Sequence, residues 1–491
     1  MKTLTAVSAL AIAVSGMATA QDLPQAENEW FVSGQERLAE ELAKQPNTNR
    51  ALNIILMISD GNGVGTNYAS RLFAGQQEGG FGDEYVQPQE AFPNLALVKT
   101  YNVNAQTPDS AGTGTAMMAG IKTKAGIIGV NENVNRGDCS TLPGNTVSSM
   151  NELMSEMGKE TGIVSTARIT HATPASAYAK TVDRNFEASV PEGCDTQTDI
   201  ATQLIEAMRS GMIDVAMGGG MRNFHGDEGG RREDGVNLMD VAQSELGAHL
   251  ATDQASFENT PLDGTPILGL FESSHMMYEA DREDEPSLAD MTGAAIQALQ
   301  AKSGDNGFFL QVEAGRVDHA NHGGNLARAV RDQKAFSDAV AIADELTDDA
   351  DTLIIVTADH EHALAFNGYC GRGSDILGLC MGIDGEGVAH TGEPELGADN
   401  KPFTVAGYLN GAGSVLTEQA DGSFFGTRPA LTEEAATDLD YLQQAVVPKS
   451  SETHSGEDVA AYAKGPWAHL VDGTIEQNMI FHIMNYAATA E

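Results

Sequence analysis

The stretch NIILMIS (53–59) decides the fold of this chain. Its apolar residues follow one another without polar alternation, and the run stops at Asp60-Gly61-Asn62-Gly63. A short continuous apolar run that ends in turn residues is typical of a strand buried on both faces, as in a parallel sheet. We therefore expect a buried strand here, with Asp60 just past its carboxyl end.

Other short apolar runs have the same strand character, and helical patterns separate them. The runs are LVKTYNV (97–103), GIVSTA (162–167), FFLQV (308–312) and TLIIVTA (352–358). Apolar residues at three- and four-residue spacing predict helices over 146–159, 198–210, 286–302 and 325–346. Apolar strands that alternate with helices favour an α/β fold, with a central mostly parallel β-sheet and helices on both faces.

Polar side chains follow three of the predicted strands at the point where each strand ends. These side chains are Asp60, Glu313 and the pair Asp359-His360. Ligands bind at this edge of open α/β sheets. A lone Asp after a strand usually caps a helix, but several carboxylates with histidines beside them are hard to explain as caps. The sequence therefore predicts a ligand site at this edge.

Histidines and carboxylates gather in three short segments. The segments are Asp318-His319-Ala320-Asn321-His322, Asp359-His360-Glu361-His362 and Glu452-Thr453-His454, and His171 lies just past another predicted strand. A single histidine is more often a surface or core residue than a ligand, but this clustering favours ligands. Nitrogen and carboxylate ligands without cysteine are typical of catalytic zinc, and all-oxygen positions suit magnesium.

Ser110 stands at the start of a predicted helix of small residues, in Thr107-Pro108-Asp109-Ser110-Ala111-Gly112. One interpretation is that Ser110 or Asp109 only caps that helix. The other is that Ser110 is a nucleophile, because a helix N-terminus stabilises negative charge on an alkoxide and on a bound phosphate. A nearby metal ion would lower the pKa of the hydroxyl further.

With these motifs in this order, the sequence resembles the metal-dependent alkaline phosphatases from about residue 50 to 480. The matching segments are ISDGNGVG (58–65), TPDSAGTGTAMMAG (107–120), HATPASAYAKTVDR (171–184), VEAGRVDHANH (312–322), TADHEH (357–362) and ETHSGEDVAAYAKGP (452–466). The resemblance implies hydrolysis of phosphate monoesters through a covalent phosphoserine intermediate, with release of inorganic phosphate. It also implies two Zn²⁺ and one Mg²⁺ per subunit.

The resemblance assigns roles residue by residue. The implied metal ligands are Asp318, His322 and His454 for one zinc ion, Asp359, His360 and Asp60 for the second, and Asp60, Thr173 and Glu313 for magnesium. Ser110 corresponds to the nucleophile. Arg184 corresponds to the arginine that binds two phosphate oxygens, because its spacing from His171 selects it over Arg168.

Other residues correspond to supporting positions around this site: Asp109, His171, His319 and His362. Because His171 and His319 are both histidine here, as in the animal enzymes, the third metal could also be zinc. Animal members have an additional Ca²⁺ site, and only Phe271-Glu272 and Glu285 support such a site in this sequence.

The family also suggests the domain organisation and a homodimer. After a signal peptide (1–20), we expect an α/β catalytic core over 21–365, a loop-rich crown-like insertion over 366–450, and completion of the core over 451–491. In the family the crown lies over the dimer, and residues 30–44 could form the N-terminal arm that crosses the two-fold interface.

Charge is the most unusual feature of the composition. The 491 residues include 28 Lys+Arg and 70 Asp+Glu, a net charge of −42. Such a surface repels nucleic acid phosphates and anionic lipid, so we expect neither nucleic acid binding nor binding at a membrane surface. Two interpretations stay open: acidity that suits an enzyme to high salt, and acidity with no role in stability.

The N-terminus predicts export from the cytoplasm. Lys2, an apolar run over 6–14 and Ala18-Thr19-Ala20 before Gln21 form a secretory signal with cleavage after Ala20, so the protein is expected to be periplasmic or secreted. No membrane anchor is predicted.

Outside the cytoplasm the four cysteines, Cys139, Cys194, Cys370 and Cys380, favour disulfides over a structural zinc site, with three possible connectivities. Pairing nearest neighbours gives Cys139–Cys194 and Cys370–Cys380, and a bridge like the first recurs in the family.

Two other functions are alternatives. One is a sulfatase or phosphodiesterase on the same fold, although no formylglycine motif is present. The other is a periplasmic phosphate- or metal-binding protein without turnover, which would not need Ser110 beside Asp109 at a helix start.

Overall fold

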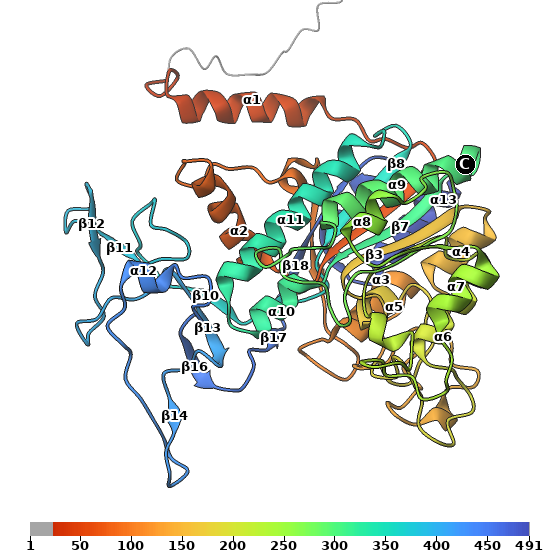
Figure 1. Cartoon of the computed structure of the whole chain (residues 1–491). Helices are drawn as coiled ribbons and strands as arrows, with labels where there is room; N and C mark the ends of the chain where they lie inside the picture. The colour runs from red at the N-terminus through yellow and green to blue at the C-terminus, as the bar shows by residue number, and fades with distance from the viewer. Residues whose placement is uncertain (1–22, 491) are drawn as a thin grey trace, which may run out of the picture. The chain divides into compact units, whose positions relative to one another are not determined.

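The computed structural model describes residues 23–490, and its main feature is a ten-stranded sheet (Figure 1). The strand order is β19-β2-β18-β8-β1-β7-β3-β4-β6-β5, and all neighbours are parallel except β18, which is antiparallel to β2 and β8. The bounds are β1 Asn53–Ser59, β2 Asn94–Lys99, β3 Glu160–Arg168, β4 Val215–Gly219, β5 His249–Ala251, β6 Ile267–Leu270, β7 Phe308–Ala314, β8 Thr352–Thr357, β18 Val459–Lys464 and β19 Gly473–Glu476. The predicted mostly parallel sheet is confirmed.

The register of the three central strands positions the candidate site. All residues of β1 are buried, and β1 lies between β8 and β7. Ile58 of β1 is opposite Glu313 of β7 and Thr357 of β8. The carboxyl ends of the three strands therefore lie at one edge of the sheet, where Asp60 and Asp359 follow.

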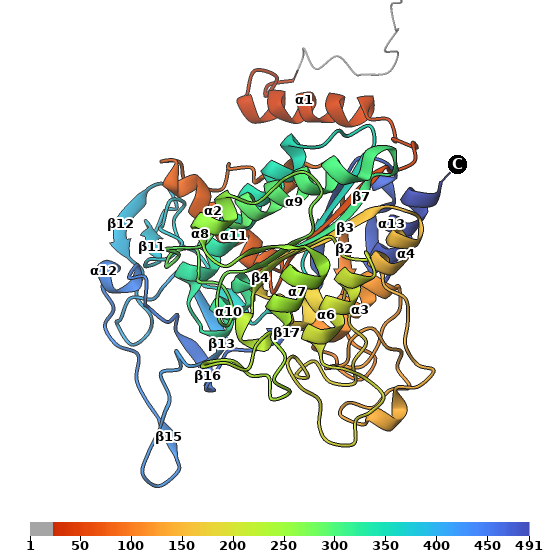
Figure 2. The ribbon, with the colours of Figure 1, turned by 45° about the vertical axis from the view of Figure 1, so that its right-hand side comes forward.

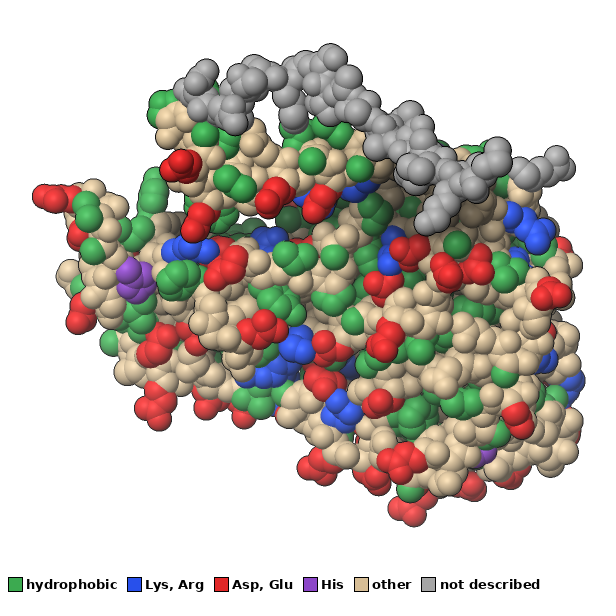
Figure 3. All heavy atoms as spheres, turned by 90° about the horizontal axis from the view of Figure 1, so that it is seen from above, with side chains coloured by type: hydrophobic (Ala, Val, Ile, Leu, Met, Phe, Trp, Pro, Cys, Tyr) green, Lys and Arg blue, Asp and Glu red, His purple; other side chains and the backbone are tan. Residues whose placement is uncertain are grey.

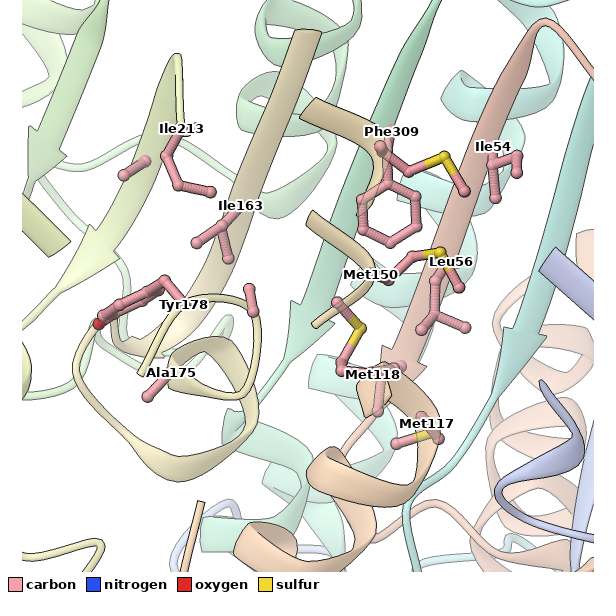
Figure 4. Packing of buried hydrophobic residues seen from close by; sticks show 14 of the residues in the cluster. Ile54, Leu56, Met117, Met118, Met150, Ile163, Ala175, Tyr178, Ile213 and Phe309 are labelled. Atoms are coloured by element: carbon pink, nitrogen blue, oxygen red, sulfur yellow. The ribbon is translucent and has the colours of Figure 1, made fainter. Parts of the chain in front are cut away.

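Alternate residues of β1 pack into two different cores, because successive side chains of a strand point to opposite faces. Ile54 and Leu56 belong to one buried cluster, together with methionines of two helices that Figure 4 shows close by. Ile55 and Met57 belong to the other cluster. Burying an aliphatic side chain of this size contributes about 1.5–3 kcal/mol, so both cores fix the central strand.

Helices cover both faces of the sheet (Figures 1 and 2). The helices that contribute to the first core are α3 Ser110–Ala119, α4 Met150–Glu156, α5 Ala172–Ala175, α6 Ile200–Arg209, α7 Leu238–Leu246 and α13 Met479–Thr489. Those that contribute to the second are α9 Leu288–Ser303, α10 Arg316–His322 and α11 Leu326–Glu345. The remaining helices of this part are α2 Val64–Gln77 and α8 Gln254–Glu258.

The four predicted helices exist, and side-chain caps set where they begin. Asp199, Ser287 and Asn325 each accept a hydrogen bond from the first turn of α6, α9 and α11. The helix predicted over 146–159 is shorter, because Ser149 forms a capping box with Glu152 and Thr146 pairs with Val130 in a β-bridge instead.

Small sheets replace long elements between residues 364 and 448. Their members are β10 Leu364–Phe366, β11 Met381–Ile383, β12 His390–Pro394, β13 Ala406–Gly411, β14 Thr417–Glu418, β15 Phe424–Phe425 and β16 Ala445–Pro448, with one short helix, α12 Glu433–Ala436. β9 Glu361–His362 and β17 His454–Ser455 flank this segment and pair with each other. Disulfides join Cys370 to Cys380 and Cys139 to Cys194, the nearest-neighbour pairing.

The described residues up to Pro46, 23–46, belong to a unit separate from the rest of the chain. Its described part contains α1 Glu29–Ala43, which begins where the Asn28 side chain accepts a hydrogen bond from Trp30 N at 3.0 Å. The predicted signal peptide over 1–20 lies outside the described residues. Among the helices within 23–490, none is long and apolar enough to cross a membrane.

Candidate active site

The first group of ligating side chains lies directly past β1 and β8. Asp60, Asp359 and His360 are fully buried and each offers a ligand atom within 4.8 Å of the others. His360 Nε2 lies 3.4 Å from Asp60 Oδ1 and 3.2 Å from Asp359 Oδ2. Burial and the neighbouring carboxylates raise the pKa of Asp60 well above its usual range. A bound cation would remove this repulsion, so the donor set fits a metal ion.

A second group is formed by Asp318, His322 and His454. Asp318 Oδ1 lies 3.4 Å from His322 Nε2 and 3.2 Å from His454 Nε2, and the two Nε2 atoms are 3.0 Å apart. The outer nitrogens of both rings donate to backbone carbonyls, His322 to Glu452 at 2.6 Å and His454 to Pro108 at 2.9 Å. These bonds place the lone pairs on the inner nitrogens, the tautomer that a metal ion requires.

His362 connects this group to a buried carboxylate. Its Nε2 lies 2.8 Å from Asp318 Oδ1 and its Nδ1 lies 2.5 Å from Glu452 Oε2. Although burial opposes the charged form, these two carboxylates raise the pKa of His362 to about 10. His362, predicted to orient a zinc ligand, is therefore in contact with Asp318, one of the predicted ligands. Glu452 was not among the predicted site residues, although its place two residues before His454 was a signal that could have found it.

A third group lies on the other side of Asp60. Asp60, His171 and Glu313 offer ligand atoms within 4.8 Å of one another, and Thr173 Oγ1 donates to Asp60 Oδ2 at 3.4 Å. Asp60 Oδ1 and Glu313 Oε1 are buried without a hydrogen-bond partner. Two orphaned carboxylate oxygens beside a hydroxyl fit a hard cation. Ser165, which donates to Glu313 Oε2, is a further site residue that sequence reasoning missed.

Ser110 lies at the first position of α3, between these groups. Its Oγ is 3.4 Å from Asp60 Oδ2 and 3.3 Å from His360 Nε2. Asp109 is the N-cap and accepts from Gly112 N at 3.2 Å. A Cβ at Gly112 would displace the Asn102 side chain, which donates to Asp109 Oδ1 at 3.1 Å. Asp109 thus caps α3, and the buried Ser110 hydroxyl lies beside the first group of ligating side chains.

Arg184 is held by the same aspartate. Its Nη1 donates to Asp109 Oδ2 at 3.0 Å, and its Nη2 donates to His171 Nε2 at 3.0 Å. Although burial opposes it, the charge of Arg184 and the backbone N–H groups of Gly112 and Gly126 lower the pKa of Asp109. Arg168 instead binds Glu187 with two hydrogen bonds of 2.8 and 2.7 Å.

The comparisons with known proteins agree with this geometry. The family model described as "Alkaline phosphatase" matches residues 51–490. The chain is 39% identical to an alkaline phosphatase of Gadus morhua, over 95% of this chain and 97% of that protein. It is 37% identical to the tissue-nonspecific alkaline phosphatase isozyme of Homo sapiens, over 98% of this chain and 92% of that protein. The chain belongs to the alkaline phosphatase family. Its relatives are phosphoric monoester hydrolases.

The alkaline phosphatase fold is also seen in solved structures. The Thermus thermophilus alkaline phosphatase superposes with a TM-score of 0.64 at 22% identity, covering 91% of this chain and 93% of that one. At this identity the likeness concerns the fold alone. The expected α/β architecture with a large parallel sheet is the alkaline phosphatase architecture.

Two predicted residues, His319 and Glu285, lie outside the three groups. His319 lies beside His171 and His275, and these three imidazoles form a cluster with ligand atoms within 4.8 Å of one another. His275 was not predicted from the sequence. Glu285 is buried, and burial raises its pKa to about 7. In the described part of the chain, no group of three or more potential ligands contains Glu285 or Glu272.

Proposed function

We propose that this protein hydrolyses phosphate monoesters through a covalent phosphoserine on Ser110. The observation that carries the proposal is the position of Ser110 Oγ, 3.3–3.4 Å from the metal-ligand atoms of His360 and Asp60, at the N-terminus of α3. The N-terminus of a helix stabilises both an attacking alkoxide and a bound phosphate.

The donor sets support three metal ions with the stoichiometry of the family. One Zn²⁺ would be held by Asp318, His322 and His454, a second by Asp359, His360 and Asp60, and Mg²⁺ by Asp60, Thr173 and Glu313. When bound, these ions act as Lewis acids for the attacking and leaving oxygens of the transferring phosphoryl group. His362 orients Asp318, and His171 and His319 border the magnesium ligands.

Arg184 binds and orients the phosphoryl group. A guanidinium presents paired N–H donors that match two phosphate oxygens. Asp109 accepts from Arg184 through Oδ2 and caps α3 through Oδ1. The same carboxylate therefore fixes the arginine relative to Ser110. Few other contacts to the substrate are needed, so we expect broad tolerance of the leaving group.

The proposal includes an exported homodimer. We expect cleavage after Ala20, a mature periplasmic or secreted chain, and a dimer covered by the 366–450 insertion and joined by the 30–44 arm. Mature protein that starts elsewhere than Gln21, or sedimentation that gives only monomer in moderate salt, would contradict these two points. Neither alternative, the sulfatase or phosphodiesterase and the binding protein without turnover, is favoured by the comparisons.

The test is turnover of p-nitrophenyl phosphate by the metal-loaded enzyme together with metal analysis. Ser110→Ala should keep its zinc and magnesium content but lose several decades in kcat, at about 1.4 kcal/mol per decade. Ser140→Ala, which changes an exposed serine, is the matched control and should keep full activity. A Ser110→Ala enzyme with wild-type kcat would reject the proposal.

A further inference from the structure

Three basic side chains meet beside the proposed site without belonging to it: Arg168 at the end of β3, Arg222 in the turn after β4, and His275 in the loop after β6. Gly220 packs directly on Arg168, because a Cβ at Gly220 would lie 3.0 Å from Arg168 Cβ. Arg222 N donates to Ser273 O at 3.2 Å, which holds the Arg222 turn against the His275 loop.

Arg168 and His275 contact each other through two N–H donors, and neither side chain offers an acceptor at that contact. The backbone N of Arg168 donates to His275 Nδ1 at 3.2 Å, so the neutral ring carries its proton on Nε2. That Nε2 is in close contact with Arg168 Nη1, which can only donate. Nε and Nη2 of Arg168 are already bound to Glu187. An acceptor that received both N–H groups would resolve this contact.

Two neighbouring nitrogens are also left without a partner. Arg222 Nε and His319 Nδ1 are buried atoms that have no hydrogen bond among the described residues. The rings of His319 and His275 are 4.0 Å apart, so His319 lies against the same cluster. An unsatisfied buried polar group costs about 1–3 kcal/mol, and a bound acceptor would recover part of that free energy.

The charge around the cluster favours an anion over a metal ion. Burial lowers the pKa of His275 most, and the guanidinium charges of Arg168, Arg316 and Arg222 lower it further. Burial, Arg231 and Arg168 lower the pKa of Arg222 in the same way, and only Glu187 acts against them. Although the three imidazoles could in principle ligate a cation, these guanidinium groups would repel it. The positive field also contrasts with the net charge of −42 of the whole chain.

We propose that Arg168, Arg222 and His275 bind a second phosphoryl dianion beside the catalytic phosphate site. The inference rests on the proposed function and names a further binding site next to it. Arg184 Nη2 lies 3.0 Å from His171 Nε2, and the rings of His171 and His275 are 5.2 Å apart. One imidazole thus separates the two arginine sites. The second dianion is either free inorganic phosphate or the second phosphoryl group of a doubly phosphorylated substrate.

Equilibrium dialysis of the zinc- and magnesium-loaded enzyme against labelled inorganic phosphate tests the site. The wild type should bind one more equivalent of phosphate per chain than Arg222→Gln and His275→Gln. Arg209→Gln, which removes an exposed arginine on α6, should bind as the wild type does. Both test variants should keep the wild-type kcat on p-nitrophenyl phosphate, and a kcat lost only in the variants would move these residues into the catalytic site and overturn the second site. Absence of turnover by the wild type itself would instead reject the proposed function.

A second arm distinguishes the source of the dianion. The ratio of kcat/KM for a hexose bisphosphate to that for the hexose monophosphate should fall roughly tenfold in both variants if a substrate group occupies the site. If the variants lose one equivalent of phosphate in dialysis but keep the wild-type ratio of kcat/KM values, the site binds free phosphate. Equal phosphate binding by the wild type and both variants would overturn the proposal. So would loss of one metal ion per chain in His275→Gln, which would make the cluster a cation site.

Discussion

At the scale of single residues, Asp109 connects the two chemical parts of the site. It caps α3 through Gly112 N, receives Gly126 N at 3.0 Å, and receives Arg184 Nη1 at 3.0 Å. The sequence placed Ser110 at a helix start but could not distinguish Arg184 from Arg168 without the family resemblance. Arg168 ends β3 and Arg184 follows later in the chain, and only the fold shows that Nε and Nη2 of Arg168 bind Glu187 while Arg184 binds Asp109.

Arg184→Gln should reduce kcat/KM for p-nitrophenyl phosphate by about 10²–10³-fold, since a charged donor to the transition state is lost. The inhibition constant of inorganic phosphate should rise in parallel. Arg136→Gln breaks a comparable but half-exposed pair with Asp183 and serves as the control. If phosphate inhibits Arg184→Gln as strongly as the wild type, Arg184 does not bind the phosphoryl group.

Glu452→Gln should weaken zinc binding by about 10–100-fold, because carboxylates that support metal ligands tune affinity by this amount. Glu452 fixes His362, which in turn contacts Asp318. Competition with a chelator measures the affinity. Glu457→Gln changes an exposed carboxylate nearby and should leave it unchanged. Equal zinc affinity in the two variants would remove Glu452 from the metal site.

At the scale of elements, apolar runs predicted the central strands well and their ends less well. The run 53–59 coincides with β1, since burial on both faces removes any polar interruption. Glu313 was expected after its strand but lies inside β7, because a carboxylate near the end of a buried strand breaks the apolar pattern that marks the strand. β18 was missed: its alternating burial belongs to an antiparallel strand rather than to a parallel one.

A buried carboxylate on α11 gives a pH-dependent prediction. Asp332 accepts from Glu279 N at 3.3 and 3.2 Å, and burial raises its pKa to about 8. The folded state therefore keeps a proton that the unfolded chain releases above about pH 4, so stability falls as pH rises from about 4 to about 8, by up to about 1.4 kcal/mol per unit.

Asp332→Asn should remove this loss, so the stability difference between wild type and variant should grow across that range. Denaturant unfolding at several pH values measures it. Asp338→Asn on the same helix is exposed and paired with Lys334, and provides the control. Parallel stability curves for wild type and Asp332→Asn would show that Asp332 is not held protonated.

At the scale of the whole molecule, charge sets the expected response to salt. Acidic side chains are spread over the face shown in Figure 3, with fewer basic ones between them. Removal of residues 1–20 would remove one Lys, giving 27 − 70 = −43. These charges repel one another over about 30 Å at 0.01 M salt but only about 3 Å at 1 M, and such repulsion destabilises the compact state.

We therefore expect the Tm of the metal-saturated enzyme to rise between about 0.05 and about 2 M sodium chloride, with activity retained, as in salt-adapted proteins. Thermal unfolding with zinc and magnesium present throughout measures it. A flat or falling Tm would mean that the acidity has no stabilising role in salt.

The central claim is that the phosphoryl group passes through Ser110. Acid quenching of the metal-loaded enzyme during turnover of a labelled phosphate monoester, followed by peptide mapping, tests it most directly. We expect label on the peptide that contains Asp109-Ser110-Ala111, as phosphoserine at Ser110, and none in Ser110→Ala. Label on any other residue, or turnover by the wild type without a labelled peptide, would contradict it.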